Sequence, residues 1–318
     1  MYGPTDETES IATIHAALDH GITLLDTGDF YGMGHNEMLI GRSLRGRRNQ
    51  VLLSVKFGAL PAPDGGWIGY DAHPVAVKNF VAYSLARLGV DHIDIYRPAR
   101  LDPKVPIEDM VGAIAELVKA GYVRAIGLSE VGPETIRRAQ AVHPICDLQI
   151  EHSLISRGPE EKIFATLAEL GIGITAYGVL SRGLLSGSQP VIKGDLRARF
   201  PRFTGANRQS NQAIIDALQR LASEKRVRPA KLAIAWVLAK SKSIVPVIGA
   251  RTRAQLSESL DALQLRLSLP TLPVLRRQFL PRPSLEPATT STKCGCWTAS
   301  GSGSRTITAE SVLRRIRA

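Results

Sequence analysis

A short pattern recurs along this chain: a helical stretch ends in a glycine, and a run of β-branched and other apolar residues follows. The four glycines that carry the pattern are Gly21, Gly89, Gly121 and Gly171. Each of them suits the left-handed backbone position that ends a helix. Strands that alternate with helices at this spacing predict a parallel sheet in an α/β fold.

The same patterns give an expected order of elements. Strands are expected near residues 22–27, 51–57, 92–96, 123–129, 146–151, 172–177 and 244–249. Helices are expected near residues 7–20, 35–45, 74–88, 107–120, 133–141, 159–170, 208–224, 229–240 and 252–262. A (β/α)8 TIM barrel needs eight strands to close. The sequence therefore predicts this fold with one strand fewer than a closed barrel requires.

The chain changes character near residue 267. We expect residues 1–266 to form the barrel and residues 267–318 to form an atypical tail, first interrupted by prolines and then rich in Ser, Thr and Gly. Such a composition buries too little apolar surface to offset the entropy of ordering the chain. Most of the tail is therefore expected to be disordered.

The net charge of +11 is placed unevenly along the chain. From Leu267 onward there are eight Lys or Arg and two Glu, so +6 of the +11 lies in the tail and +5 in the body. A mildly basic body suits a phosphate-bearing cofactor, and no clustered basic patch indicates nucleic acid as a partner.

Features of membrane, secreted and metal-binding proteins are weak here. No apolar run approaches the roughly 20 residues that span a membrane, and the short polar start Met1–Asp6 is unlike a signal peptide. We expect a cytoplasmic protein. Cys146, Cys294 and Cys296 cannot form a disulfide framework, and a lone Cys-x-Cys pair is a poor metal signal, so no metal site is expected.

Three residues fall at the carboxyl ends of neighbouring predicted strands, where parallel barrels place their reacting groups. Asp26 ends the strand near 22–27, Tyr31 lies in the loop after it, and Lys56 ends the strand near 51–57. Strands about 4.8 Å apart would let Lys56 and Asp26 pair. A lysine ammonium beside a phenol favours the phenolate, as a proton donor to a carbonyl oxygen requires. Each residue alone is commonly solvated or in a structural pair, so the prediction depends on their joint placement.

Several segments resemble the aldo-keto reductase family. They are Leu25–Gly32 (LDTGDFYG), Val55–Gly58 (VKFG), Gly127–Glu130 (GLSE), Gln149–Ser153 (QIEHS), Ala176–Leu185 (AYGVLSRGLL) and Val247–Arg253 (VIGARTR). The resemblance extends in order over residues 1 to about 266. It implies reduction of an aldehyde or ketone by hydride from NAD(P)H, with Tyr31 as proton donor, Lys56 as the partner that lowers its pKa, and Asp26 as the support of Lys56.

The resemblance also implies a cofactor site. Ser129 and Gln149 are similar to residues that hold the nicotinamide carboxamide, and Tyr177 to one that stacks on the ring. The segment that contains Leu180, Arg182 and Leu184 would lie over the pyrophosphate, and the segment that contains Gly249, Arg251 and Arg253 would approach the adenosine phosphate. Glu258 is similar to an adenine contact. Arginines at a helix start favour phosphate, so NADPH is expected, with NADH possible.

One expected catalytic position departs from the family. Its members carry a histidine at the end of the fourth strand, and Ala99 stands there in this chain. The family's histidine orients the substrate carbonyl, so its loss would weaken reduction or change the substrate. Arg97 or Arg100 would supply a hydrogen bond instead, with a charge that also stabilises the forming alkoxide.

The ends of the chain depart from the family as well. The family's first barrel strand precedes the position of Met1, and its C-terminal helices are unlike the stretch after Leu267. Two strands, near 22–27 and 244–249, are therefore expected to have exposed edges. Two alternatives to a reductase follow from these departures: a non-catalytic NADPH-binding sensor or regulatory barrel, and a truncated inactive product. The oligomeric state is left open.

Overall fold

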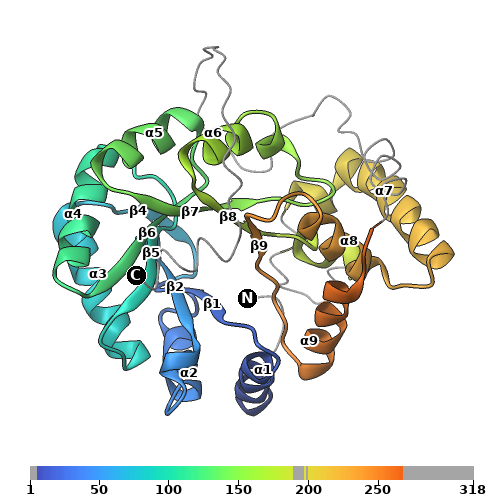
Figure 1. The fold of residues 1–318 in the computed structure, drawn as a ribbon, viewed down its shortest axis with the longest axis horizontal. Helices are drawn as coiled ribbons and strands as arrows, with labels where there is room; N and C mark the ends of the chain where they lie inside the picture. Colours follow the sequence, from blue (N-terminus) through green and yellow to red (C-terminus); the bar gives the residue numbers. More distant parts are fainter. Residues whose placement is uncertain (1–5, 189–196, 198–199, 268–318) are drawn as a thin grey trace.

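The computed structural model describes residues 6–188, 197 and 200–267 (Figure 1). Seven parallel strands form one sheet in the order β1-β2-β5-β6-β7-β8-β9. They are β1 Leu24–Gly28, β2 Leu52–Phe57, β5 Ile93–Pro98, β6 Val123–Ser129, β7 Ile145–Glu151, β8 Gly173–Tyr177 and β9 Ile244–Pro246. The sheet curls around a concave inner face, as in a (β/α)8 barrel (Figure 1).

Helices cover the convex outer face of this sheet (Figure 1). They are α1 Glu7–Asp19, α2 His35–Ser43, α3 Pro74–Leu88, α4 Ile107–Lys119, α5 Pro133–Val142, α6 Ile163–Leu170, α7 Gly205–Glu224, α8 Pro229–Leu238 and α9 Arg253–Leu260. The four glycines of the repeated pattern all have positive φ, between 65° at Gly89 and 84° at Gly121. The sequence prediction of where these helices end is therefore confirmed, because only glycine adopts this backbone freely.

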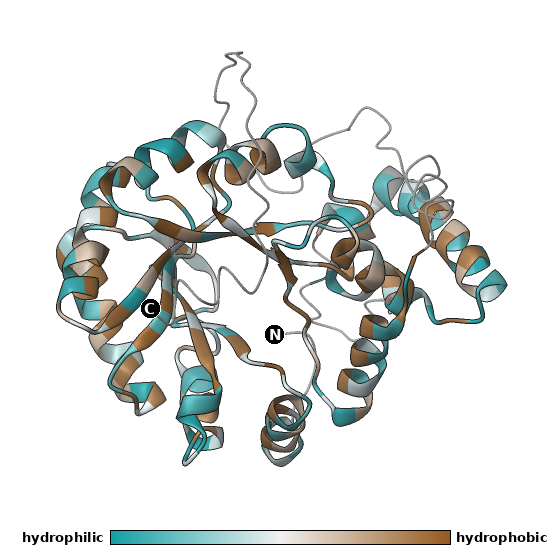
Figure 2. Cartoon of the chain, in the orientation of Figure 1, coloured by the Kyte–Doolittle hydropathy of each residue, from teal (hydrophilic) through white to brown (hydrophobic). Residues whose placement is uncertain are grey.

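The main apolar core lies between the sheet and its helices, as the brown inner sides of the elements show (Figure 2). Residues that alternate along the strands point to the concave face instead. Near the amino ends of the strands this face carries a small apolar cluster built on Leu52 and Ile95. Toward the carboxyl ends it is polar, with buried Ser54, Arg97 and Asp147. The change from apolar to polar along one face brings charged side chains together at one end of the sheet.

A two-stranded hairpin was absent from the sequence prediction. Strands β3 Ala59–Pro61 and β4 Trp67–Tyr70 pair antiparallel within the connection between β2 and α3. The hairpin carries Pro61 and its connecting segment carries Gly65 and Gly66, so the segment resembles a loop in the sequence. It places Trp67 and Tyr70 beyond the carboxyl end of β2.

Strands β1 and β9 are the two ends of the sheet, and no ladder joins them in the part of the chain that the structure describes. The two edges are thus unpaired there as expected, although the residues of both strands are buried or half-buried. Outside the sheet, α1 and α9 lie side by side (Figure 1). Glu9 of α1 and Arg253 of α9 form an ion pair at 3.0 Å across this contact. The expected tail, residues 267–318, falls outside the described residues except for Leu267.

None of the helices among the described residues has both the length and the apolar character that a membrane span needs.

The strand β2 gives a direct test of the core. Leu53 is fully buried within the main cluster. We expect Leu53→Ala to lower the free energy of unfolding by about 2–5 kcal/mol, through lost apolar burial and the cavity that remains. Urea denaturation measures this difference. Val75→Ala is the control, because Val75 is 81% exposed and its truncation should change stability by less than about 0.5 kcal/mol. Equal effects of the two substitutions would contradict this placement of the core.

Candidate active site

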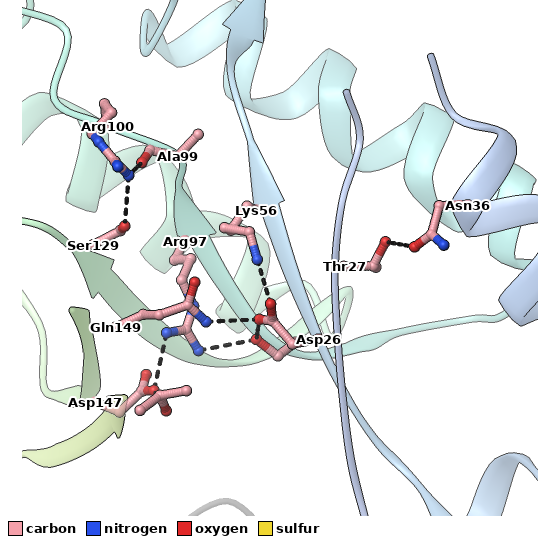
Figure 3. Close-up of polar contacts among 12 residues, drawn as sticks. Asp26, Thr27, Asn36, Lys56, Arg97, Ala99, Arg100, Ser129, Asp147 and Gln149 are labelled. Carbon is pink, nitrogen blue, oxygen red and sulfur yellow. Dashed lines mark hydrogen bonds and ion pairs between the residues drawn. The ribbon is translucent and has the colours of Figure 1, made fainter. Parts of the chain in front are cut away.

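Asp26 is the centre of the polar end of the concave face (Figure 3). Its side chain is only 9% exposed, and it forms an ion pair with Lys56. Its Oδ1 also accepts hydrogen bonds from Ser54 Oγ and Gln149 Nε2, both at 2.8 Å. The sheet register sets this up, because Asp26 lies opposite Ser54 on β2, two residues before Lys56. Three strands therefore converge on one buried carboxylate.

Lys56 connects this carboxylate to Tyr31. The Lys56 Nζ atom lies 5.1 Å from the centre of the Tyr31 ring. The loop that carries Tyr31 is held against β2, because Asp29 N donates to Lys56 O at 2.9 Å and Tyr31 N donates to Gly28 O at 3.0 Å. The structure thus brings Asp26, Lys56 and Tyr31 together, as the sequence predicted for their positions.

A second ion pair lies directly beside the first. Arg97 on β5 is fully buried, and its Nη1 atom is 3.0 Å from Asp147 Oδ2 on β7. Arg97 also donates to Ser54 Oγ at 3.1 Å. Burial opposes ionisation of Asp26, but the charges of Lys56 and Arg97 outweigh it and hold the pKa of Asp26 below its usual value. Arg97 is kept charged in the same way. Burial lowers its pKa, but the negative charges of Asp147 and Asp26 outweigh burial, so the pKa of Arg97 is raised.

Ala99 is buried at the end of β5, with its N–H bonded to Phe57 O at 2.7 Å. The Ala99 side chain is a methyl group, so it offers no hydrogen-bond donor to a substrate carbonyl. Two arginines lie beside Ala99. The side chain of Arg97 points toward Asp147 inside the curled sheet, whereas Arg100 reaches the carboxyl ends of the neighbouring strands (Figure 3). Arg100 Nη1 donates to Ser129 Oγ at 3.4 Å, and Nη2 donates to the Tyr177 hydroxyl at 3.2 Å. Arg100 is thus the arginine that faces the expected site.

The residues expected to hold nicotinamide lie at or near the carboxyl ends of three successive strands. Ser129 is the last residue of β6, Gln149 pairs with it on β7, and Tyr177 is the last residue of β8. Ser129 and Gln149 are buried. Burial, reinforced by the nearby Glu130, raises the pKa of Tyr177 well above its usual value, so its ring stays neutral. One Arg100 guanidinium reaches both Ser129 and Tyr177, which shows how closely the two lie. A hydroxyl, an amide and an aromatic ring so arranged fit a carboxamide on a flat ring.

The segment expected over the pyrophosphate is irregular backbone. Leu180 precedes a short 3-10 turn, Ser181–Ser186, in which Leu184 is buried. Arg182 has a positive φ of 59°, and its guanidinium lies 4.3 Å from the centre of the Phe200 ring. Gly249 is exposed in the segment between β9 and α9.

The expected adenosine-phosphate residues lie at the start of α9. Arg251 and Arg253 are both exposed there. Arg253 binds Glu9 of α1 through its backbone N–H at 2.8 Å and through its guanidinium. Glu258 lies 3.3 Å from Arg228. Arg253 and Glu258 therefore have partners within the chain, and a cofactor would have to share or replace them.

Arg97 and Asp147 were not recognised as a pair from sequence. The available signal was Asp147 itself, a carboxylate inside the apolar strand Ile145–Glu151, since buried acidic residues are rare without a partner. The strand ladder alone does not place β5 and β7 in contact, because β6 lies between them.

One group of possible metal ligands occurs among the described residues. Oxygen and nitrogen atoms of Asp71, His73 and Asp102 lie within 4.8 Å of one another. Asp102 accepts backbone hydrogen bonds from Ala72 and Lys104, and Asp71 accepts one from His73. These bonds explain the carboxylates as supports of the loop before α3.

A curled parallel sheet, outer helices, and a buried charged cluster toward the carboxyl ends of its strands are the architecture of a (β/α)8 barrel, which places its active sites at those ends. The comparisons with known proteins identify the family. Residues 1–271 match the model of the aldo/keto reductase family, so the chain belongs to that family of oxidoreductases. The resemblance stated from the motifs is confirmed.

Named relatives agree. A probable aldo-keto reductase 1 from Glycine max is 39% identical over 272 residues, covering 83% of this chain and 78% of that protein. The aldo-keto reductase yakc [NADP(+)] of Schizosaccharomyces pombe is 36% identical over 285 residues, covering 87% and 84%. Among solved structures, the glycerol dehydrogenase AKR11B4 from Gluconobacter oxydans matches with a TM-score of 0.80 at 29% identity, covering 91% of each chain.

Breaking the second ion pair should destabilise the protein. In Arg97→Met, Asp147 keeps its charge in a buried position without its cation, and we expect a loss of roughly 3–5 kcal/mol in the free energy of unfolding. The double variant Arg97→Met/Asp147→Asn removes both charges and should recover part of that loss. Guanidinium denaturation measures Arg97→Met, Asp147→Asn and the double variant. If the double variant were as unstable as the sum of its single variants, the pair would not be energetically coupled.

Asp29 should make stability depend on pH near neutrality. Burial raises the pKa of Asp29 to about 7, against an opposing hydrogen bond from Gly58 N, and nearby Glu37 adds to the rise. Since the unfolded carboxyl has a pKa of 3.8, the folded protein binds the extra proton between these values. Stability should therefore fall as pH rises from about 4 to about 7 and then level off.

Asp29→Asn should abolish that fall, and exposed Asp64→Asn should leave it unchanged. Thermal unfolding midpoints across this range measure the effect. A parallel fall in the wild type and in Asp29→Asn would assign the pH dependence to another group.

Proposed function

We propose that this chain reduces an aldehyde or ketone to an alcohol with NADPH, and that Tyr31 donates the proton. The observation that supports this most directly is the position of Lys56, paired with the buried Asp26 on one side and 5.1 Å from the Tyr31 ring centre on the other. A held cation beside a phenol stabilises the phenolate that remains after the proton leaves.

Each residue has a separate task in this reaction. The Tyr31 hydroxyl gives its proton to the carbonyl oxygen as negative charge develops there. Lys56 stabilises the resulting phenolate, and Asp26 keeps Lys56 charged and in place. Bound NADPH supplies the hydride that reduces the carbonyl carbon.

The cofactor would occupy the ends of the later strands. Ser129 and Gln149 would hold the carboxamide, Tyr177 would stack on the ring, and the segment with Leu180, Arg182 and Leu184 would cover the pyrophosphate. Gly249, Arg251 and Arg253 would receive the adenosine phosphate, with Glu258 at the adenine. The Schizosaccharomyces pombe relative is named for NADP(+), which supports NADPH over NADH. We further propose that residues 1–266 are the working unit and that it acts in the cytoplasm.

Arg100 takes over the carbonyl-orienting role of the histidine that Ala99 replaces. It directly follows Ala99 and already contacts Ser129 and Tyr177. Its positive charge would stabilise the developing alkoxide as well as orient the carbonyl.

A non-catalytic NADPH-binding barrel is the second candidate. Ala99 favours it, because the usual donor to the substrate is absent. The retained contact of Asp26, Lys56 and Tyr31 favours the enzyme, since cofactor binding alone does not need a proton donor.

Tyr31→Phe separates these two functions. We expect kcat/KM for aldehyde-dependent NADPH oxidation to fall by roughly 100- to 10,000-fold, because the general acid is lost. NADPH affinity, measured by fluorescence quenching, should stay unchanged. Tyr83→Phe is the matched control, because Tyr83 is exposed on α3. NADPH binding without any oxidation in the wild type would support the regulatory barrel instead.

A further inference from the structure

Arg100 is a half-buried cation whose partners in the structure are neutral. Its guanidinium donates to Ala99 O at 2.7 Å, to Ser129 Oγ at 3.4 Å and to the Tyr177 hydroxyl at 3.2 Å. No Asp or Glu oxygen lies within 4.0 Å of it in the part of the chain that the structure describes. Glu130 is the carboxylate that contributes to its electrostatic surroundings, from beyond ion-pair distance.

This arrangement differs from that of the other buried arginine nearby. Arg97 is satisfied by Asp147 at 3.0 Å and is closed to solvent. Arg100 instead lies at the carboxyl ends of the strands, where substrates bind in this fold. A guanidinium is a planar fork of donors that matches a carboxylate in a bidentate contact. A half-buried guanidinium that lacks an internal carboxylate can take one from a ligand.

We propose that the substrate is a 2-oxo acid, whose carboxylate and adjacent carbonyl oxygen are both bound by Arg100. The inference rests on the proposed reductase function. Arg100 follows the position at which the family's donor meets the carbonyl, and Ala99 N is bonded to Phe57 O on the lysine-bearing strand. In a 2-oxo acid, one carboxylate oxygen and the carbonyl oxygen can lie side by side, so a single fork spans both.

The side of the site near Tyr31 indicates an apolar or aromatic remainder of the substrate. Phe30 packs edge-on against Tyr31 at 4.7 Å between ring centres, and against Trp67 of the hairpin at 5.7 Å. Trp67 is 60% exposed, and the hairpin's Ile68 and Tyr70 are exposed as well. An aryl or branched alkyl group would cover these side chains.

The reaction balances as a two-electron reduction. The hydride forms a C–H bond at C2 while the carbonyl π bond breaks, and Tyr31 protonates the oxygen. The 2-oxo acid is reduced to a 2-hydroxy acid and NADPH is oxidised to NADP⁺, with the proton on Tyr31 restored from solvent. Arg100 and the carboxylate remain unchanged throughout.

The test compares phenylglyoxylate with its methyl ester, which keeps the ketone and the aryl group but lacks the anion. In Arg100→Met, we expect kcat/KM for phenylglyoxylate to fall by roughly 10- to 100-fold more than kcat/KM for the ester, because a charge-assisted contact is lost. Arg100→Lys should recover part of the difference, since it keeps the charge without the fork. Arg208→Met, at an exposed arginine on α7, controls for the change in net charge.

A binding measurement separates recognition from turnover. Calorimetry on the NADP⁺-loaded protein, which cannot reduce a ketone, should show tighter binding of phenylglyoxylate than of the ester, and Arg100→Met should remove that preference. Equal losses for acid and ester in Arg100→Met would overturn the inference and leave the reductase function intact. Absence of NADPH oxidation with either compound and with simple aldehydes would overturn the proposed function itself.

Discussion

The arrangement of the concave face depends on one constraint: Asp26 is an ionised carboxylate almost closed off from water. A charge in such a place needs opposite charges and hydrogen-bond donors close by. Lys56 and the field of Arg97 supply the first, and Ser54 and Gln149 the second. Arg97 in turn needs Asp147. The Arg97–Asp147 pair also restricts the residue at position 127. A Cβ on Gly127 would lie 2.6 Å from Asp147 Oδ1 and 3.1 Å from Arg97 Cζ, so a side chain there would collide with the ion pair.

Such a network is a poor way to gain stability. Buried ion pairs are often neutral or unfavourable compared with apolar residues of the same size, because both charges lose their hydration. Nearer the amino ends of the strands, the same concave face is filled by apolar side chains instead of ion pairs, among them Leu52 and Ile95. The linked ion pairs of Asp26 and Asp147 lie toward the carboxyl ends of the strands, where Lys56 reaches Tyr31. The most economical reason for maintaining them there is chemical, since they fix a cation beside a phenol.

The sequence was sufficient for the helix ends and for the contact between neighbouring strand ends, although it missed the short β3–β4 hairpin. The positive-φ glycines placed the helix ends, and the positions of Asp26 and Lys56 at neighbouring strand ends predicted their contact. It was insufficient where the outcome depended on contacts between distant elements. Arg97 and Arg100 looked equivalent beside Ala99, but strand alternation and Asp147 turn Arg97 into the interior. The exposed helix start at Arg253 looked open to phosphate, but Glu9, far away in the chain, binds it.

If Arg100 takes the role of the histidine that Ala99 replaces, as proposed, the two ligands would also affect each other. Arg100 contacts Ser129 and Tyr177, the same groups that would receive the nicotinamide ring. A carboxamide held by Ser129 would compete for the Ser129–Arg100 hydrogen bond and free that guanidinium donor toward the carbonyl position. The guanidinium would keep its bonds to Ala99 O and to the Tyr177 hydroxyl, because stacking engages the ring face of Tyr177 and not its hydroxyl. Cofactor binding would thus prepare the proposed anion site, because the guanidinium donor that it frees is one that an oxo acid can accept from.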